Sequence, residues 1–320
     1  MRVIIQGVGA VGGVTAAALF LSGTEVIGIA RGRMLAAMQD RGLRLRAPGV
    51  DDVVPVPAVA HPSEITFRTD DAILLCVKGQ DTVAALEDLR RAGVTDQPIF
   101  CAQNGIANEH AALRRFPNVH GVTVMMPAQY LHPGEVAVFT EPKLGIFDLG
   151  RFPYGHDADD ATMAAALEAA NIGAFISDKV MESKAGKLLI NLKNVLWAVL
   201  GRDADMGDLP DRIRAEAEAV FRAAGITWVE VDDSDPRRAA LMRNVDVPGI
   251  TRVGGSTNQS LLRGATRVET DYLNGEIAYL GRLHGVPVPV NTALTRIGDR
   301  AAAEGWKPGH LTLGDIQAFL

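Results

Sequence analysis

The chain has 320 residues, which is enough for two domains and too long for one small core. Its formal charge of −6 argues against non-specific binding to nucleic acid, because such binding depends on clustered lysine and arginine. No signal-peptide pattern and no run of about 20 apolar residues occurs, so neither secretion nor a membrane span is expected. Cys76 and Cys101 lack metal-ligand spacing, and we expect free thiols in a reducing, cytoplasmic compartment with no bound metal.

The chain opens with the pattern of a dinucleotide-binding unit, in which a glycine-rich turn and a helix lie between two strands. The strands are predicted over 3–5 and 25–29, and the helix over 14–21. The first glycine of such a turn permits a tight bend, the second lets the backbone approach the pyrophosphate, and the third allows close packing of helix on strand. The phosphates then lie on the free N–H groups of the helix start. We therefore expect the cofactor to contact Gly7, Val8, Gly9, Ala10, Val11 and Gly12.

The residues after the second strand discriminate between the two nicotinamide dinucleotides. NAD sites usually carry Asp or Glu there to bind the ribose hydroxyls, but this chain has Ala30-Arg31-Gly32-Arg33. The Arg31 guanidinium can fork onto a 2′-phosphate and stack on adenine. We therefore predict NADP(H) as the cofactor, with an ordinary surface arginine as the alternative.

Two further buried strands are predicted over 72–77 and 98–101, and polar residues follow both of them. Ligands of open α/β sheets lie beyond the carboxyl ends of the strands. Lys78, Thr82 and Asn104 are therefore placed where a nicotinamide or a substrate binds, and we assign Lys78 and Asn104 to the cofactor. The alternative for each residue is a plain turn or cap, since an Asn-Gly pair is a strong turn signal.

Strand patterns continue to residue 177, with a turn at Pro133-Gly134, and then stop. The predicted helices that follow cover 180–200, 210–224, 234–244, 265–284 and 289–304. The fold class is therefore α/β, with an N-terminal Rossmann-type dinucleotide-binding domain over 1–178 and an all-α C-terminal domain over 179–320. We expect the substrate and the cofactor to meet between the two domains.

The first helix of the second domain, predicted from Lys184 to Trp197, is apolar almost all round, as buried helices are. At about 100° per residue, Lys187, Asn191 and Asn194 form one narrow polar strip on it. A buried amine and two amides require partners, so we predict that this strip faces a small ligand. The alternative is a solvated edge of the helix, and we expect Lys184 to be solvated.

Two polar stretches nearer the C-terminus contain further candidates. Ser256 and Thr257 follow two glycines, and Glu269 opens the stretch Glu-Thr-Asp-Tyr-Leu-Asn-Gly. We predict that Ser256 binds a carboxylate or hydroxyl of the substrate and that Glu269 lies beside Lys187. The alternatives are a helix cap for the hydroxyl residues and a favourable interaction with a helix dipole for the glutamate.

These motifs together resemble the ketopantoate reductase (2-dehydropantoate 2-reductase) family over essentially the full length of the chain. The matching elements are Gly7-x-Gly9-x-x-Gly12, Arg31, Lys78, Gln103-Asn104-Gly105, Lys187-x-x-x-Asn191, the Ser256 region and Glu269-Thr-Asp-Tyr-Leu-Asn-Gly275. The resemblance implies a Rossmann domain followed by a helical domain. It also implies NADPH-dependent reduction of a branched 2-oxo acid to a 2-hydroxy acid in pantothenate biosynthesis.

The resemblance implies roles for individual residues as well. Lys187 is the expected general acid, and Asn191 and Ser256 are expected to hold the substrate. Asn104 is expected to contact the nicotinamide side, and Glu269 to line the site near the lysine. An ammonium group there stabilises and then protonates the oxygen that becomes negative when hydride reaches the carbonyl carbon. Burial lowers a lysine pKa and a carboxylate raises it, so the sequence leaves that balance open.

Two departures from the family pattern concern the substrate. The family often has a second asparagine at the position of Val195, whereas this chain has Asn194 just before it. Counting back from Glu269 without a gap places Thr257, rather than Ser256, at the family's serine. We therefore include Asn194 and Thr257 among the candidate substrate-binding residues, and the identity of the 2-oxo acid stays open.

Two other functions also stay open. A related NADP-dependent dehydrogenase of 2-oxo acids or β-hydroxy acids shares this architecture, and so does an NADPH-binding sensor without activity. The lysine–glutamate pair argues against the sensor, because a sensor needs no proton donor. A homodimer built on the helical domain is a further option, which the sequence does not locate.

Overall fold

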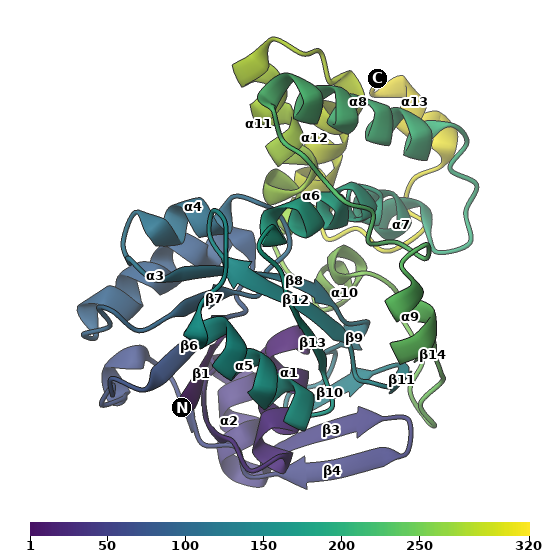
Figure 1. Ribbon diagram of the computed structural model, residues 1–320. Helices are drawn as coiled ribbons and strands as arrows, with labels where there is room; N and C mark the ends of the chain where they lie inside the picture. The colour runs from purple at the N-terminus through teal and green to yellow at the C-terminus, as the bar shows by residue number, and fades with distance from the viewer.

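The computed structural model describes residues 1–320 and consists of a sheet-based domain followed by a helical one (Figure 1). The main sheet has eight strands in the order β13-β12-β8-β7-β6-β1-β2-β5. All neighbours pair in parallel except β8 and β12, which are antiparallel. The strands are β1 Arg2–Gln6, β2 Glu25–Ile29, β5 Ala58–Val59, β6 Asp71–Leu75, β7 Ile99–Cys101, β8 Val119–Met125, β12 Ile146–Arg151 and β13 Gly173–Ile176.

The strand order reverses beside β1, which pairs with β2 on one side and β6 on the other. In open α/β sheets such a reversal creates the crevice in which a dinucleotide binds, at the carboxyl ends of the strands. The central strands are buried along their whole length because helices cover both faces. Helices α1 (Ala10–Leu21) and α5 (Ala158–Ala169) cover one face, and α3 (Thr82–Arg91) and α4 (Asn108–Leu113) cover the other. The Rossmann-type expectation is therefore confirmed, and both cysteines are unpaired as expected.

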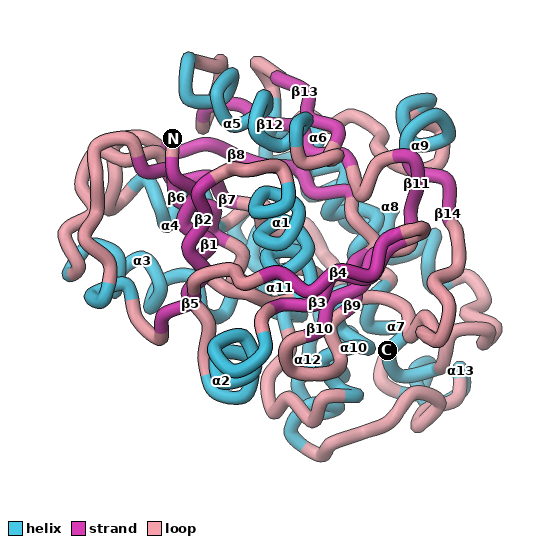
Figure 2. Tube along the Cα trace, turned by 90° about the horizontal axis from the view of Figure 1, so that it is seen from below, coloured by secondary structure: helices cyan, strands magenta, loops and turns pink.

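A second sheet, in the order β4-β3-β10-β9, is a feature that the sequence pattern does not predict. It lies against α1, and Figure 2 shows β3 and β4 running together past that helix. A Cβ at Gly13 of α1 would lie only 2.6 Å from Val136 Cγ1 of β10, so this close approach requires glycine. The predicted turn is confirmed, since Gly134 has φ +79° between antiparallel β9 and β10. The elements are α2 Gly32–Arg41, β3 Leu43–Ala47, β4 Val50–Val54, β9 Ala128–Gln129 and β10 Glu135–Val138.

The second domain is built from helices around one apolar core. The expectation of an all-α domain needs one correction, because β14 (Met242–Asn244) pairs with β11 (Thr140–Pro142) of the first domain. The helix predicted over 234–244 ends at Leu241, and the chain then runs extended along β11. None of the helices combines the length and the apolar content needed to cross a membrane. The helices are α6 Val180–Asn191, α7 Asn194–Leu200, α8 Leu209–Ala224, α9 Pro236–Leu241, α10 Ser256–Leu262, η3 Glu269–Tyr272, α11 Asn274–His284, α12 Pro289–Ala303 and α13 Leu313–Ala318.

The helix predicted over 184–197 is interrupted in the structure. Helix α6 ends at Asn191, α7 begins at Asn194, and a short turn joins them. The buried amide of Asn274 donates a hydrogen bond of 3.0 Å to the Leu192 carbonyl, a group left free by the interruption. The break therefore separates Asn191 from Asn194, both candidate substrate-binding residues. The Asn274 side chain, from the stretch that begins at Glu269, stabilises it.

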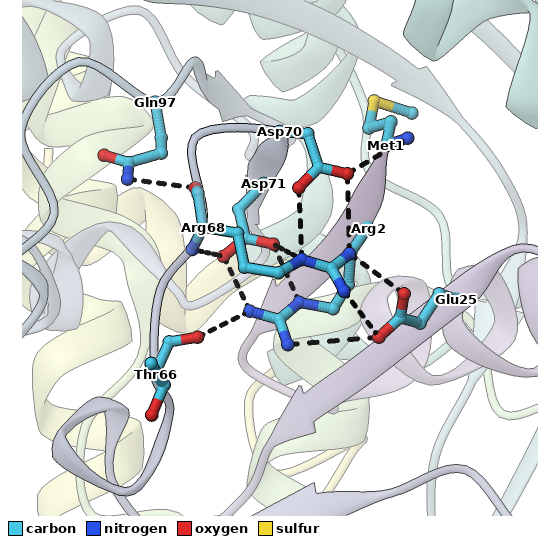
Figure 3. Close-up of polar contacts among 8 residues, drawn as sticks. All are labelled: Met1, Arg2, Glu25, Thr66, Arg68, Asp70, Asp71 and Gln97. Carbon is cyan, nitrogen blue, oxygen red and sulfur yellow. Dashed lines mark hydrogen bonds and ion pairs between the residues drawn. The ribbon is translucent and has the colours of Figure 1, made fainter.

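The amino edge of the main sheet, where the parallel strands begin, is closed by a network of charges (Figure 3). Arg2 of β1 donates from Nε and Nη2 to both carboxylate oxygens of Asp71 on β6, each over 2.7 Å. The Arg68 backbone N–H also donates to Asp71 over 2.7 Å, and its guanidinium pairs with Glu25 on β2. The Asp71 side chain is fully buried, so these bonds supply the partners that a buried carboxylate requires.

Candidate active site

The glycine-rich turn has the geometry that the sequence predicts. A Cβ at Gly12 would lie 2.2 Å from the Gly7 carbonyl oxygen and 3.0 Å from Cys76 Cβ, so only glycine permits this contact between helix and strand. Gly9 is the N-cap of α1, and a Cβ there would meet nothing within 4 Å. Close packing behind the turn, with open space and free N–H groups before it, fits a pyrophosphate. The segment consists of the predicted cofactor residues Gly7, Val8, Gly9, Ala10, Val11 and Gly12.

Arg31 lies just beyond β2, where dinucleotide-binding domains recognise the adenosine ribose. It is the N-cap of α2, and 65% of its side chain is exposed. Its carboxylate partner is Asp88 on α3, at 3.8 Å. The stretch Ala30–Arg33 contains no acid, so a cation stands where an NAD site places a carboxylate.

Lys78 and Asn104 follow the neighbouring strands β6 and β7, as predicted. Buried hydrogen bonds connect their loops: Gln103 Nε2 donates to Thr82 Oγ1, and Thr82 Oγ1 donates to Asn108 Oδ1, both over 2.8 Å. Asn108 Nδ2 then donates to the Asn104 carbonyl over 2.9 Å. The hydroxyl of Thr82 is therefore engaged within the protein, which corrects its placement among the ligand-contacting residues.

Glu269 is buried where the helical domain meets these two loops. Its Oε1 accepts a hydrogen bond of 2.8 Å from the Gly79 N–H, and the Asn104 amide and the Lys78 ammonium lie near its carboxylate. Burial raises the pKa of Glu269, while these three neighbours oppose that shift. Glu269, a predicted catalytic residue, thus lies near Lys78 and Asn104, two predicted cofactor residues.

Ser260 and Arg263 join this group, although the sequence analysis does not single them out. Lys78 Nζ donates to Ser260 Oγ, and Arg263 Nη2 donates to the same oxygen over 3.3 Å. Helical spacing is the signal that points to Ser260, because it lies one turn beyond Ser256 on α10. We use the term seam cluster for the residues Lys78, Asn104, Ser260, Arg263 and Glu269, which lie where the two domains meet.

Ser256 and Thr257 form the first turn of α10. Gly255 is the N-cap of this helix, and no side chain caps it, so the capping alternative for the two hydroxyl residues is wrong. A Cβ at Gly255 would lie 3.3 Å from Asn194 Oδ1, which places that asparagine against the same turn. Thr257 is buried and Ser256 is partly exposed. Both hydroxyl residues stay candidates for the substrate.

Lys187 lies on α6, and its amine has no hydrogen-bond or ion-pair partner in the protein. The side chain is partly exposed yet closely surrounded, and burial lowers its pKa to about 8, with Arg238 of α9 adding to the effect. The expected neighbour Glu269 is not beside it, because the lysines that act on the Glu269 carboxylate are Lys78 and Lys184. The expectation of an adjacent lysine–glutamate pair is therefore corrected: no ion pair joins the two residues, and Glu269 instead contacts the loops after β6 and β7.

Asn191 lies one turn beyond Lys187 on α6 and is buried. Its Nδ2 has no hydrogen-bond partner in the protein. A buried N–H group without an acceptor is costly, so each one in a folded protein requires an explanation. A ligand oxygen is an acceptor of the required kind, so Asn191 stays a candidate for binding the substrate.

Lys184, which the sequence analysis expects to be solvated, is instead 2% exposed. Its ammonium pairs with Glu109 of α4 at 2.7 Å and donates to three backbone carbonyls of β7, β8 and the loop after β7. Helical periodicity gives the face on which a side chain lies, but it does not show that strand carbonyls cover that face. Lys184 thereby fastens α6 to the sheet, and its amine is not free to donate a proton to a substrate.

Comparison with known proteins accounts for both domains. Residues 3–153 match the family described as Ketopantoate reductase PanE/ApbA, and residues 180–300 match Ketopantoate reductase PanE/ApbA C terminal. A 2-dehydropantoate 2-reductase from Halobacterium salinarum is 25% identical over 317 residues, covering 95% of this chain and 100% of the relative. Another from Mesorhizobium japonicum is 28% identical over 339 residues, covering 95% of this chain and 98% of the relative.

Solved structures resemble the chain over the same extent. A PanE/ApbA family ketopantoate reductase from Ralstonia eutropha JMP134 has a TM-score of 0.77 at 30% identity, covering 95% of this chain and 99% of that chain. The ternary structure of D-mandelate dehydrogenase with NADH and anilino(oxo)acetate has a TM-score of 0.78 at 24% identity, with the same coverage. The second likeness, at 24% identity, shows the fold alone.

Proposed function

Because the chain belongs to the ketopantoate reductase family of oxidoreductases acting on CH–OH groups, we propose that it reduces 2-dehydropantoate (ketopantoate) to (R)-pantoate with NADPH. This reaction is a step of pantothenate biosynthesis. One observation carries the proposal: the Lys187 amine has no partner in the protein and a pKa of about 8, one turn from the orphaned Nδ2 of Asn191. An available acid beside an available amide donor suits a carbonyl substrate.

The proposed cofactor is NADP(H). Membership of the family implies a nicotinamide dinucleotide, and the open space before Gly9 supports a pyrophosphate at the α1 N-terminus. The choice of the phosphorylated form rests on Arg31, an exposed cation whose guanidinium would pair with the 2′-phosphate. It also rests on the residues beside Arg31, which include no acid to bind an unmodified ribose.

Reduction adds a hydride to the keto carbon and a proton to the keto oxygen, and so yields a 2-hydroxy acid and the oxidised cofactor. The reduced nicotinamide, when bound, supplies the hydride. Lys187 holds the proton: its ammonium stabilises the negative charge on the keto oxygen and then donates the proton from Nζ. With a pKa of about 8, this amine is a stronger acid than an ordinary lysine and is still mostly protonated at pH 7. Its partial exposure lets water return the proton after each turnover.

The remaining candidates have supporting roles in this proposal. Asn191 donates from its free Nδ2 to a substrate oxygen, and Asn194, at the start of α7, binds the substrate together with the first turn of α10. Asn104 contacts the nicotinamide side. Glu269 orients that side of the site, because its carboxylate holds the Gly79 N–H after β6 and lies near Lys78.

The assay that tests the proposal measures NADPH oxidation against a panel of ketopantoate, pyruvate and larger 2-oxo acids. Ketopantoate should have the highest kcat/KM. Lys187→Ala should lower kcat by about 10²–10⁴-fold, the usual contribution of a positioned general acid. Lys179→Ala is the matched control, since that lysine precedes the same helix with 66% of its side chain exposed, and it should leave turnover unchanged.

The outcomes separate the alternatives. If another 2-oxo acid is clearly preferred, the chain is a related reductase with a different substrate. If no 2-oxo acid on the panel is reduced, the NADPH-binding sensor gains support. Full turnover by Lys187→Ala would show that the role assigned to this lysine is wrong.

A further inference from the structure

Arg263 is a partly buried cation whose partners in the protein are all neutral. Its Nη1 donates to the Tyr130 carbonyl over 2.7 Å, its guanidinium lies 5.0 Å from the centre of the Tyr130 ring, and its Nη2 donates to Ser260 Oγ. Arg2 and Arg237 lie in comparably protected positions, and each forms hydrogen bonds with a carboxylate. Unlike Arg2 and Arg237, Arg263 therefore has no carboxylate to compensate its charge.

The Ser260 hydroxyl cannot supply that charge, because its hydrogen-bonding capacity is already in use. Its proton goes to the Ser256 carbonyl over 2.9 Å, and its oxygen accepts from both Lys78 and Arg263. Burial lowers the pKa of Lys78 and of Arg263, and the charge of Arg263 lowers that of Lys78 further. Glu269 and Asp81, which lies outside the seam cluster, both act on Lys78, and the Glu269 carboxylate also accepts from a backbone N–H, but no acid compensates Arg263. The seam cluster thus has two cations and one carboxylate.

We propose that Arg263 binds the carboxylate of the 2-oxo acid together with Lys78, which is thereby reassigned from the cofactor to the substrate, so that Arg263 makes the enzyme selective for acids over neutral ketones. This inference rests on the proposed function. A planar guanidinium matches a carboxylate with two parallel N–H donors, and a ligand carboxylate would bring the missing negative charge to this pair of cations. The anionic groups of the cofactor are assigned elsewhere, the pyrophosphate to the N-terminus of α1 and the 2′-phosphate to Arg31, and Lys187 is assigned to the keto oxygen.

The test compares a 2-oxo acid with the amide of the same acid, which keeps the keto group and loses the charge. Arg263→Gln should raise KM for the acid by about 10–100-fold, the usual effect of losing one charge-assisted hydrogen bond, and should leave KM for the amide unchanged. Arg263→Lys should restore part of the preference for the acid. The dissociation constant for NADPH, from fluorescence titration without substrate, should be the same in all three proteins. Arg267→Gln is the matched control, because that residue is exposed and lies four positions away.

Each alternative result overturns the inference in a recognisable way. Equal losses with the acid and the amide would mean that Arg263 only supports the local fold. Weaker NADPH binding with an unchanged KM for the acid would assign the cation pair to a cofactor phosphate. If the wild-type protein reduces no 2-oxo acid, the proposed function fails and this inference fails with it. If the wild-type protein reduces 2-oxo acids and Arg263→Gln reduces them with the same kinetic constants, this inference fails and the proposed function stands.

Discussion

At the amino edge of the main sheet, the Arg2 guanidinium and the Asp71 carboxylate form a buried pair with two hydrogen bonds of 2.7 Å (Figure 3). Beyond the carboxyl edge, the Lys187 amine and Nδ2 of Asn191 have no partner in the protein. Both regions hold polar groups that are buried or partly buried in the same fold. The charges at the amino edge have hydrogen-bond partners, whereas Lys187 and Nδ2 of Asn191 have none.

The paired groups stabilise the fold, and the unpaired groups are those that we propose to act on a ligand. A paired buried charge can be lost only at a large cost in stability, because its partner stays behind without compensation. An unpaired polar group lowers stability before any ligand arrives, and such groups persist mainly at functional sites. Substitutions at the amino edge should therefore change the free energy of unfolding, and those beyond the carboxyl edge should change turnover or binding.

Lys187→Met should produce the largest effect, with kcat reduced by about 10²–10⁴-fold and stability at pH 7 increased. Burial lowers the pKa of this amine from 10.5 to about 8, so the folded state at pH 7 carries a charged lysine in an unfavourable setting. That cost is at most about 3 kcal/mol, is fully present below pH 8 and disappears as the pH rises from 8 to 10.5. Thermal unfolding and steady-state kinetics measure the two effects, and a less stable Met variant would contradict the assignment of Lys187 as an unpaired group.

Asp71→Asn should lower the free energy of unfolding by about 3–5 kcal/mol, because Arg2 is left buried without its counter-charge. The kcat per folded molecule should be unchanged, since this edge lies at the opposite ends of the strands from the proposed site. Denaturant unfolding gives the first quantity and active-site titration the second. Asp70→Asn is the control on the same edge; its side chain is 54% exposed, and the loss should stay below about 1 kcal/mol.

Arg31→Ala should weaken NADPH binding by about 10–100-fold and leave NADH binding unchanged, because only NADPH carries the 2′-phosphate. Fluorescence titration of both cofactors measures the ratio. Arg41→Ala, at the other end of α2, serves as a control for general loss of positive charge. Equal affinities of the wild-type protein for the two cofactors would rule out the NADP(H) proposal at once.

Asn274→Leu should have the smallest of these effects, about a tenfold increase in KM for the 2-oxo acid with NADPH binding unchanged. Its amide holds the Leu192 carbonyl at the interruption between Asn191 and Asn194, so its loss should disturb the geometry of both asparagines. Glu216→Ala is the matched control. The Glu216 carboxylate accepts from Asn291 in the same buried network without touching Leu192, so its removal should lower stability and spare KM.

The dinucleotide-binding half of the fold is predictable from the sequence because its signals are local. A Cβ at Gly12 would meet the Gly7 carbonyl oxygen within one strand–turn–helix unit, and Gly9 leaves open space at the helix start, as the motif predicts. The second sheet is not predictable in this way, since β3 and β10 meet only after about 90 intervening residues are placed. Local spacing says nothing about such pairings.

The site shows the same division between local and long-range information. Helical spacing alone places Asn191 one turn beyond Lys187, but it does not predict the interruption of the helix before Asn194. Nor does it predict the burial of Lys184, because Glu109 and the strand carbonyls that surround it come from distant parts of the chain. The separation of Lys187 from Glu269 also escapes sequence reasoning, since it depends on how distant parts of the chain pack around α6.

The pH dependence of kcat for reduction tests the central claim, that the unpaired Lys187 is the proton donor, most directly. Reduction needs the protonated amine, so kcat should be constant below pH 7 and should fall tenfold per unit as the pH rises through the Lys187 pKa of about 8. The residual activity of Lys187→Ala should lack this fall. A kcat that stays constant up to pH 10, or the same fall in the alanine variant, would contradict the account.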